Sequence, residues 1–536
     1  MKINKYLILP VIGAALFLLP VGCSKDFLDQ KDTKNVSSDA LFKKPEDGIQ
    51  LVNAIYDTFD NLDFTLKSMW YQANFLTQDF KNYGGDTFFT TYEVPTTFDP
   101  LNTFWVRSYQ GIARANSAIP IIAQMQANGV LTADLANRLT GEAYFLRGLF
   151  YYYMGCEFGG VPLELQTVTG TGRDPRNTQD EVFASVVNDM QKAASLLPWQ
   201  QNYAASDVGR ASKGAAYAYE GSAQMWLKKY SEALASFKMI DGRYTLQKNF
   251  LDIMEYNNQN NSESIFEIQF KVPDGGDQSW GHSNDSSWLE SFGMPEEIAQ
   301  TGDDYVDPKY YQSFETGDLR RRATVIGPGE THPSPAIKIS DYNYVQTQFA
   351  SGDTRFVGDD KKIINTCGTV SKPWKGADGL RSGYYGVKYW RNPAITGGPT
   401  TKDGKQNLFG DENAVLLRYG EILVDKAECQ FRTGDVAGAL TTIQTVRDRA
   451  WGKLAGSTVT VPPPPSTGNP LYVILDEYRH ELGGDFSAWF DMRRTDQHIN
   501  YIKLNYGITV PTGKDLMPIP QLQIATNETL KQNPGY

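Results

Sequence analysis

Residues 209–240 decide the fold, and their sequence is GRASKGAAYAYEGSAQMWLKKYSEALASFKMI. Small and apolar residues recur every three or four positions over 211–225 and again over 233–240, which is the period of one helix face. The two runs predict an antiparallel helical hairpin with a short turn between them. Gly221 on the first helix and Ala233 on the second are small enough to let the helices approach closely.

A similar hairpin is predicted for residues 417–450, LRYGEILVDKAECQFRTGDVAGALTTIQTVRDRA, with Gly434 in the turn. Ala427 and Ala439 repeat the sequence spacing of Gly221 and Ala233. This spacing resembles that of tetratricopeptide-type repeats, in which small residues bring two helices together. An ordinary pair of antiparallel helices explains two copies equally well, so the sequence alone leaves both interpretations open.

The rest of the chain predicts a mainly α-helical fold with two irregular segments. Helical periods occur near 45–56, 105–119 and 131–155, and Thr178 with Glu181 has the spacing of a capping box. Segments of about 67–104 and 250–410 are rich in Gly, Pro and aromatic residues and have little periodicity, apart from a short strand expected at 264–272. Binding commonly occurs in long irregular segments on a rigid scaffold.

The N-terminus predicts a lipoprotein signal peptide over residues 1–22. Lys2 and Lys5 precede an apolar stretch over 6–19, which is too short to span a bilayer as a helix. The sequence LPVGC at 19–23 is similar to a lipobox, although Pro20 stands where Leu is usual. We therefore expect lipidation at Cys23 and a polar tether over 23–40. A plain secretory signal with an incidental cysteine is the alternative.

Charge and cysteine usage exclude several classes of partner. The net charge of −11 and the lack of a Lys/Arg-rich run argue against nucleic acid, which needs a concentrated basic surface. Cys156, Cys367 and Cys429 have no CxxC spacing and cannot all pair within one chain. We expect no metal and no cofactor.

Several stretches, in order and over nearly the full chain, resemble the SusD/RagB family of outer-membrane nutrient-binding lipoproteins. GEAYFLRGLFYY at 141–152 is similar to that family's E-A-x-F-L-R-A-x-Y-Y helix, and GRASKGAA at 209–216 to its G-R-A-T-K-G-A-A. Further matches are FGGVPL at 158–163, VRDRA at 446–450, WFDMRR at 489–494 and the terminal QNPGY at 532–536. Two departures stand out: Gly420 replaces the usual Ala, and Gly483-Gly484-Asp485 replaces an A-F-E-G run.

The resemblance implies a single SusD-like domain over 41–536, with tetratricopeptide-like hairpins as its scaffold. It also implies a glycan ligand, a SusC-like TonB-dependent transporter as partner, and attachment to the outer membrane through the lipid anchor, facing the cell exterior. A peptide or another nutrient is the alternative ligand. The charged residues in the family motifs are predicted to form scaffold ion pairs: Arg147, Arg210, Arg418, Arg447 and Glu481.

No catalytic residue is predicted. His480-Glu481 begins like the metalloprotease motif HExxH, but Gly484 occupies the place of the second histidine. The serine elbow, the phosphate-binding lysine loop and the dinucleotide fingerprint have no match in the sequence. We expect the adjacent carboxylates Asp303 and Asp304 to be solvated surface. A surface glycosidase, the less favoured alternative, would need two carboxyl groups about 5–10 Å apart in a cleft.

Binding of a glycan without catalysis needs aromatic faces beside hydrogen-bonding groups. The two irregular segments supply these residue types, whereas Trp105 lies on a regular helical stripe and is predicted to be in the core. The candidate ligand-binding residues are Trp70, Asp79, Asn82, Tyr83, Phe88 and Phe89 in the first segment, and Trp280, Trp288 and Tyr305 in the second.

Overall fold

The computed structural model describes residues 42–82, 85–271, 304–327, 332–335, 384–391, 412–465 and 469–536, together with the single residues 289, 293 and 330. Residues Lys44–Tyr536 form one compact unit. Cys23, Tyr83, Trp280, Trp288 and Cys367 lie outside the described residues, as do the predicted signal peptide and tether. No helix among the described residues is long and apolar enough to cross a membrane.

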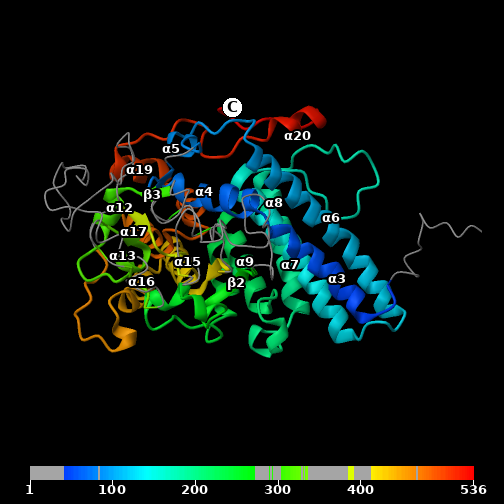
Figure 1. The fold of residues 1–536 in the computed structure, drawn as a ribbon, viewed down its shortest axis with the longest axis horizontal. Coiled ribbons are helices and arrows are strands. Elements are labelled where there is room, and N and C mark those ends of the chain that lie inside the picture. The colour runs from blue at the N-terminus through cyan, green and yellow to red at the C-terminus, as the bar shows by residue number, and fades with distance from the viewer. Residues whose placement is uncertain are drawn as a thin grey trace, which may run out of the picture. The chain divides into compact units, whose positions relative to one another are not determined.

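The N-terminal half consists of helices that pack on one another (Figure 1). They are α3 (Pro45–Tyr56), a π-helix (Asp63–Trp70), α4 (Tyr71–Phe75), α5 (Phe88–Thr91), α6 (Asp99–Ala127), α7 (Ala133–Phe158) and α8 (Gln179–Leu196), with a 3-10 turn at Asp57–Phe59. The predicted capping box is present, since Thr178 and Glu181 bond reciprocally at the start of α8.

The prediction of one long loop over 67–104 is wrong. The π-helix, α4, α5 and the start of α6 occupy most of this segment. Most of its described aromatic residues are buried against the core, which supplies the energy that the weak helical period does not. Pro100 lies in the first turn of α6, where its missing N–H costs nothing.

Helix α7 packs closely on α8 because three glycines recur along one of its faces. A Cβ at Gly141 would lie 2.9 Å from Leu197, one at Gly148 would lie 3.2 Å from Asp189, and one at Gly155 would lie 3.1 Å from Phe183. Each contact is at or beyond the limit of ordinary packing. Any larger side chain at these positions would push the two helices apart.

Both predicted hairpins are confirmed. The first pairs α9 (Lys213–Trp226) with α10 (Tyr230–Lys238), and the second pairs α15 (Tyr419–Arg432) with α16 (Val436–Ala450). A Cβ on Gly221 would overlap the Phe237 ring of α10, so the predicted close approach is present.

The two hairpins share their polar contacts as well as their shape. Gln224 accepts a hydrogen bond from Ser236 at 2.8 Å in the first, and Gln430 accepts one from Thr442 at 2.8 Å in the second. The turns have left-handed backbone at Lys228 (φ 58°) and Gly434 (φ 92°), which occupy equivalent positions. The hairpins are therefore repeats of one design.

The C-terminal half adds short helices and three two-stranded antiparallel ribbons. The helices are α12 (Pro308–Ser313), α13 (Arg320–Thr324), α17 (Pro470–Leu482), α18 (Ala488–Arg494), α19 (His498–Tyr506) and α20 (Gln521–Thr526). Strand β1 (Phe80–Asn82) pairs with β3 (Asp304–Val306), β2 (Ser264–Ile268) with β6 (Ala414–Arg418), and β4 (Val325–Ile326) with β5 (Tyr385–Gly386). Strand β2 confirms the short strand expected at 264–272. Short 3-10 turns occur at Gln200–Asn202, Ala205–Asp207, Phe250–Met254, Tyr256–Asn258 and Lys453–Ala455.

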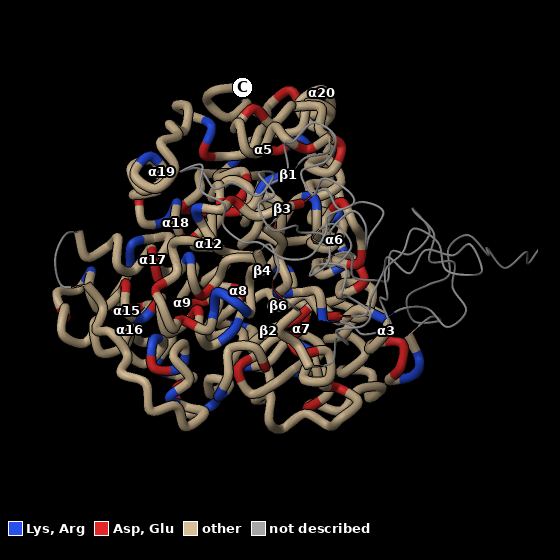
Figure 2. Tube along the Cα trace, turned by 60° about the vertical axis from the view of Figure 1, so that its left-hand side comes forward, with Lys and Arg blue, Asp and Glu red and all other residues tan. Residues whose placement is uncertain are grey.

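Positive and negative residues are interspersed along the described trace (Figure 2). The family-motif residues form the predicted scaffold ion pairs. Arg147 pairs with Asp189, Arg210 with Glu142, and Arg447 with Glu477, while Arg418 and Glu481 pair with each other.

Candidate functional site

The β1–β3 ribbon joins the two segments in which ligand-binding residues were predicted. Its register places Lys81 opposite Tyr305 and Asn82 opposite Asp304. The Asn82 side-chain amide donates a hydrogen bond to Asp304 Oδ1 at 2.7 Å, between residues far apart in the sequence. Asp304 is buried, so the prediction that it is solvated surface is wrong; its carboxylate is held by this bond inside the ribbon.

The predicted polar residue Asp79 is part of the support of the ribbon. Its carboxylate accepts a hydrogen bond from Arg479 Nε at 2.7 Å and another from the Tyr506 hydroxyl. Burial raises the pKa of Asp79, and the Arg479 guanidinium acts against that rise. Asp79 is buried and fully engaged, so its observed role is to tie β1 to α17 and α19.

Two of the predicted aromatic residues belong to the packed interior. Trp70 is 7% exposed, and its Nε1 donates a hydrogen bond to the Gly484 carbonyl oxygen at 2.7 Å. Its ring meets Phe75 and Phe80 edge to face, with centroids 5.7 Å and 5.6 Å away. Phe89 is completely buried. Neither ring presents an open stacking face.

Lys81 and Tyr305 remain half-exposed on the ribbon, and Phe88 remains half-exposed on α5. Lys81 forms an ion pair with Asp307 at 2.6 Å, which fixes the ammonium group beside β3. The ring of Phe88 packs against Phe98 with centroids 4.8 Å apart. Among the described candidates, Phe88 and Tyr305 are therefore the aromatic groups that a ligand could reach. The prediction that Trp105 belongs to the core is confirmed, since it is 4% exposed.

A small enclosed cavity lies behind the ribbon. Its volume is about 20 Å³, and its lining includes Trp70, Phe80, Tyr305, Lys388 and Trp390. A cavity of that size holds about one water molecule, not a sugar ring. Any glycan contact at the ribbon is therefore made on its outer surface.

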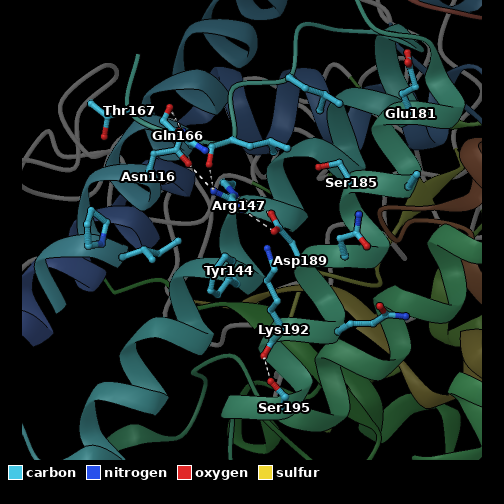
Figure 3. Close-up of a pocket in the computed structure, with 17 residues that line it drawn as sticks. Asn116, Tyr144, Arg147, Gln166, Thr167, Glu181, Ser185, Asp189, Lys192 and Ser195 are labelled. Carbon is cyan, nitrogen blue, oxygen red and sulfur yellow. Dashed lines mark hydrogen bonds and ion pairs between the residues drawn. The ribbon is translucent and has the colours of Figure 1, made fainter. Parts of the chain in front are cut away.

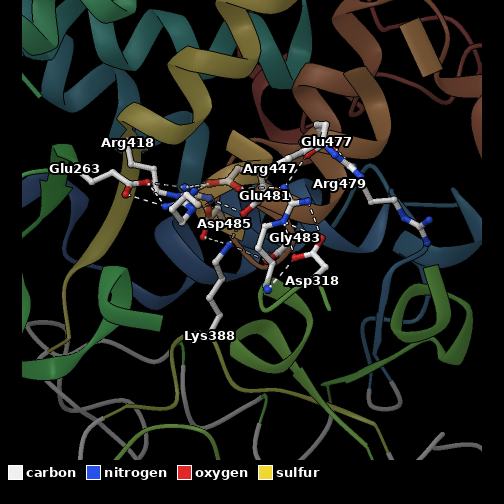
Figure 4. A network of polar contacts seen from close by, with 12 residues as sticks. Glu263, Asp318, Lys388, Arg418, Arg447, Glu477, Arg479, Glu481, Gly483 and Asp485 are labelled. Atoms are coloured by element: carbon white, nitrogen blue, oxygen red, sulfur yellow. Dashed lines mark hydrogen bonds and ion pairs between the residues drawn. The ribbon is translucent and has the colours of Figure 1, made fainter. Parts of the chain in front are cut away.

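A buried network of charges, which we call the Glu481 cluster, holds the base of this region (Figure 4). Glu481 accepts hydrogen bonds from Arg418 and Arg449 and lies 3.3 Å from Arg320. These cations hold the pKa of Glu481 far below its ordinary value, against the effect of burial. The cluster consists of the cations Arg320, Lys388, Arg418, Arg447 and Arg449 and the anions Glu263, Asp318, Glu477, Glu481 and Asp485.

The turn Gly483–Asp485 connects the Glu481 cluster to the ribbon. Lys388 Nζ donates to the carbonyl oxygens of Glu481 and Gly483 at 2.9 and 3.1 Å and lies 3.0 Å from Asp485. Burial lowers the pKa of Lys388 to about 8 despite the nearby carboxylates. On its other side the turn contacts Asn74, whose amide accepts from Gly484 N and donates to the Asp485 carbonyl oxygen, both at 2.8 Å.

The two departures from the family motifs lie in the Gly483–Asp485 turn and beside the Glu481 cluster. A Cβ at Gly420 would overlap Arg418 Nη1 and Glu481 Oε1, so the cluster occupies the space that an alanine methyl group would need. A Cβ at Gly483 would overlap the hydroxyl of Tyr310. These glycines are therefore requirements of the buried contacts.

Sequence reasoning missed Lys81 and Lys388. For Lys81 the only local signal was apolar Phe80 followed by polar Lys81 and Asn82, which indicates a strand weakly. The Gly-rich surroundings obscured this signal. For Lys388 no local signal exists, because its partners lie more than ninety positions away.

Comparison with known proteins identifies the family. The chain matches the model described as "SusD family" over residues 199–536, and the model described as "Starch-binding associating with outer membrane" over residues 26–222. A SusD-like protein of Bacteroides ovatus is 24% identical over 529 residues, covering 92% of this chain and 84% of its own. SusD-like protein P38 of Formosa agariphila is 23% identical over 540 residues, covering 95% of each chain.

Solved structures share the fold. A SusD homolog from Bacteroides thetaiotaomicron superposes with a TM-score of 0.72 at 18% identity, covering 93% of this chain and 98% of its own. Surface glycan-binding protein A from the same organism, solved in complex with laminarihexaose, superposes with a TM-score of 0.68 at 20% identity, covering 91% and 99%.

Proposed function

Since the chain belongs to the SusD family, we propose that it binds a glycan at the cell surface and does not cleave it. The observation that carries this proposal is the β1–β3 pairing. It brings the two segments together, with the half-exposed Lys81 on β1 opposite the half-exposed Tyr305 on β3, backed by buried aromatic residues and by the Glu481 cluster. A preformed aromatic surface with fixed polar neighbours is what sugar rings need. A laminarihexaose complex in the same fold supports this choice of ligand class.

The carboxylates of a wide cavity of about 1130 Å³ support binding without catalysis. This cavity lies beside α7 and is lined by Asp189 and Glu181, among others. Asp189 is held by two bonds from Arg147, and hydrogen bonds from Thr178 lower the pKa of Glu181. A glycosidase needs one carboxyl group with a raised pKa to act as the acid. The shift at Glu181 has the opposite sign.

We further propose that Cys23 carries the lipid that anchors the chain to the outer membrane, facing outward, and that a SusC-like TonB-dependent transporter receives the ligand. The LPVGC sequence at 19–23 and the family description support this arrangement. Acyl mass on the wild-type chain, absent from Cys23→Ala, is the expected result of an intact-mass measurement. A wild-type chain without lipid would disprove the anchor.

Binding is tested by titrating the purified chain with the oligosaccharides that a glycan array identifies. Tyr305→Ala is expected to weaken binding by about 1–3 kcal/mol, the scale of a lost interface anchor, with an unchanged melting temperature. Trp105→Ala is the control. Because Trp105 is a core residue, this change should lower the melting temperature instead of selectively weakening binding. No reducing ends should be released during incubation. If no glycan binds, or if sugar product accumulates in proportion to the chain, the proposal is wrong.

A further inference from the structure

Of the four cavities compared among the described residues, the largest lies in a cleft between three helices and shares no lining residue with the β1–β3 ribbon. Its volume is about 1130 Å³, compared with about 420 Å³ and 310 Å³ for two other surface cavities. Helix α7 contributes Tyr144 and Arg147, α6 and α8 flank them, and residues 163–167 border the same cavity. We call this cavity the α7 cleft. Ligand pockets usually measure about 300–1,000 Å³, so it has room for several sugar units.

The hydroxyl of Ser185 has no partner. Ser185 lines the cleft from α8, is only 6% exposed, and its Oγ bonds with no described residue. A buried hydroxyl without a hydrogen bond is costly, by about 1–3 kcal/mol in proteins. A ligand group in the cleft would satisfy it.

Arg147 lines the cleft and has one N–H for which no acceptor is found among the described residues. Its Nε and Nη2 donate to the two oxygens of Asp189 at 2.8 and 2.7 Å, and its Nη1 donates to Asn116 and to the Leu165 carbonyl oxygen at 2.7 and 2.9 Å. A guanidinium group has five N–H donors, so these four bonds leave one hydrogen on Nη2. The Asp189 carboxylate also raises the pKa of Arg147 against the effect of burial.

Lys192 is a cation of the cleft that has no ion-pair partner among the described residues. Its Nζ lies 4.8 Å from the centroid of the Tyr144 ring, and Arg147 Cζ lies 5.2 Å from the same centroid. Asp189 neutralises Arg147, and Glu181 is engaged by Thr178. The cleft is lined by two cations and two carboxylates, but no carboxylate in the described part of the chain forms an ion pair with Lys192, so its ammonium group is open to an acidic ligand.

These donors come from two neighbouring helices and belong to one cleft. Ser185, Asn188 and Lys192 recur at helical spacing along α8 and line the cleft. Figure 3 shows Ser185, Asp189 and Lys192 beside Tyr144 and Arg147. A carboxylate accepts hydrogen bonds through both oxygens, and its negative charge can form an ion pair with the Lys192 ammonium group. The amide groups of Asn188 and Gln166 line the same cleft and suit sugar hydroxyls.

We propose that the α7 cleft is a second ligand site, which takes an oligosaccharide segment bearing a carboxylate, such as a uronic acid unit. The choice of a saccharide rests on the proposed function, whereas the preference for a carboxylate rests on the Ser185, Arg147 and Lys192 donors. The site shares no residue with the β1–β3 ribbon, so each can be lost without the other.

The test is calorimetric titration of the purified chain with trigalacturonate and with its methyl ester, the same sugar with its carboxylates neutralised. Trigalacturonate should bind more tightly than the ester. Lys192→Gln should weaken trigalacturonate about tenfold, the effect of one charge-assisted hydrogen bond, and leave the ester within twofold. Ser185→Ala should weaken both several-fold without lowering the melting temperature, because the hydroxyl stabilises nothing in the free chain.

Two controls separate this site from the alternatives. Lys238→Gln removes an equally exposed lysine from α10 and should change nothing. Tyr305→Ala should leave trigalacturonate binding intact, so a failure of the ribbon proposal does not hide the second site. Equal binding of acid and ester, equal effects of Lys192→Gln and Lys238→Gln, no binding at millimolar concentration, or tighter binding of an Asp-containing tripeptide than of trigalacturonate would each overturn the proposal.

Discussion

The Glu481 cluster and a second buried group of charges around Arg494 differ in their balance. In the Glu481 cluster each buried carboxylate faces at least one cation, and cations and anions are equal in number. Around Arg494 lie Asp425, Glu428 and Asp491, at 2.8, 3.3 and 2.9 Å, with Glu421 close enough to interact with Asp491. We call these five residues the Arg494 cluster. It has one central cation for four acids, and Arg432 pairs with Glu428 at its edge at 3.5 Å.

This difference decides where the protons are. The surrounding arginines hold the pKa of Glu481 well below its ordinary range, so that it stays ionised. Burial and neighbouring carboxylates raise the pKa of Glu421 and raise that of Asp491 to about 8. The same residue types are thus kept charged in one place and kept protonated in another. A buried carboxylate is stable when it is paired or neutral, and the protein uses both solutions.

The largest effect on stability should come from removing a charge of the Glu481 cluster. Glu481→Gln leaves Arg320, Arg418 and Arg449 with less negative charge in a buried site, and we expect it to lower the free energy of unfolding by about 3–5 kcal/mol. Urea denaturation measures this. Glu315→Gln is the matched control, because Glu315 pairs with Arg447 at the 40%-exposed rim of the same network, where the expected loss is about 0–1 kcal/mol. Equal effects would refute the distinction.

A smaller effect on the free energy of unfolding, of opposite sign, is expected in the Arg494 cluster. The folded-state pKa of Asp491 is about 8 and its unfolded value is about 4, so the unfolded chain loses this proton first as pH rises. The contribution of Asp491 to stability should therefore fall between pH 4 and pH 8. Asp491→Asn should flatten this slope and raise the free energy of unfolding at pH 8 by about 1–2 kcal/mol.

The pH dependence can be measured by denaturation at several pH values. Asp496→Asn, at an exposed pair with Lys228, is the control and should leave the slope as it is in the wild type. The same pH dependence in the wild type and in Asp491→Asn would contradict a protonated Asp491.

The smallest effect concerns one hydroxyl in the Arg494 cluster. Tyr478 donates to Asp425 at 2.6 Å and lies 3.1 Å from Glu428, so it helps two acids that share one arginine. Tyr478→Phe should lower the free energy of unfolding by about 1 kcal/mol. Tyr472→Phe on the same helix is the control, since its hydroxyl bonds with no described residue. If both variants have the same stability, the hydroxyl does not support the cluster.

The helical scaffold could be predicted from the sequence because its signals are local. Gly221 and Ala427 mark the hairpins, and Thr178 with Glu181 marks the start of α8. The glycines at 141, 148 and 155 carry an equally local signal, a spacing of seven on one helix, which identifies the face that meets α8. It is visible in the sequence once a close helix contact is considered.

The candidate site was less predictable because its structure comes from distant partners. Residue types suggested that Trp70 and Asp79 bind ligand. In the structure they form hydrogen bonds with Gly484 and Arg479, which lie at the other end of the chain. Helix formation over 63–75 has the same cause, since packing outweighs a weak local preference. Ser185 illustrates the reverse case, in which an ordinary serine on a predicted helix becomes notable only because nothing bonds to it.

The contacts that hold the β1–β3 ribbon against the rest of the fold have a consequence for the order in which the chain folds. Trp70 and Gly484 are 414 positions apart, and Asp79 and Arg479 are 400 apart, so these contacts wait until almost the whole polypeptide has been made. Closing so long a loop costs entropy before any contact repays it, whereas each hairpin needs only its own neighbours. Helical pairs should therefore form early and the ribbon last. A chain that stops before residue 479 would keep its hairpins and lack the surface on which it is proposed to bind.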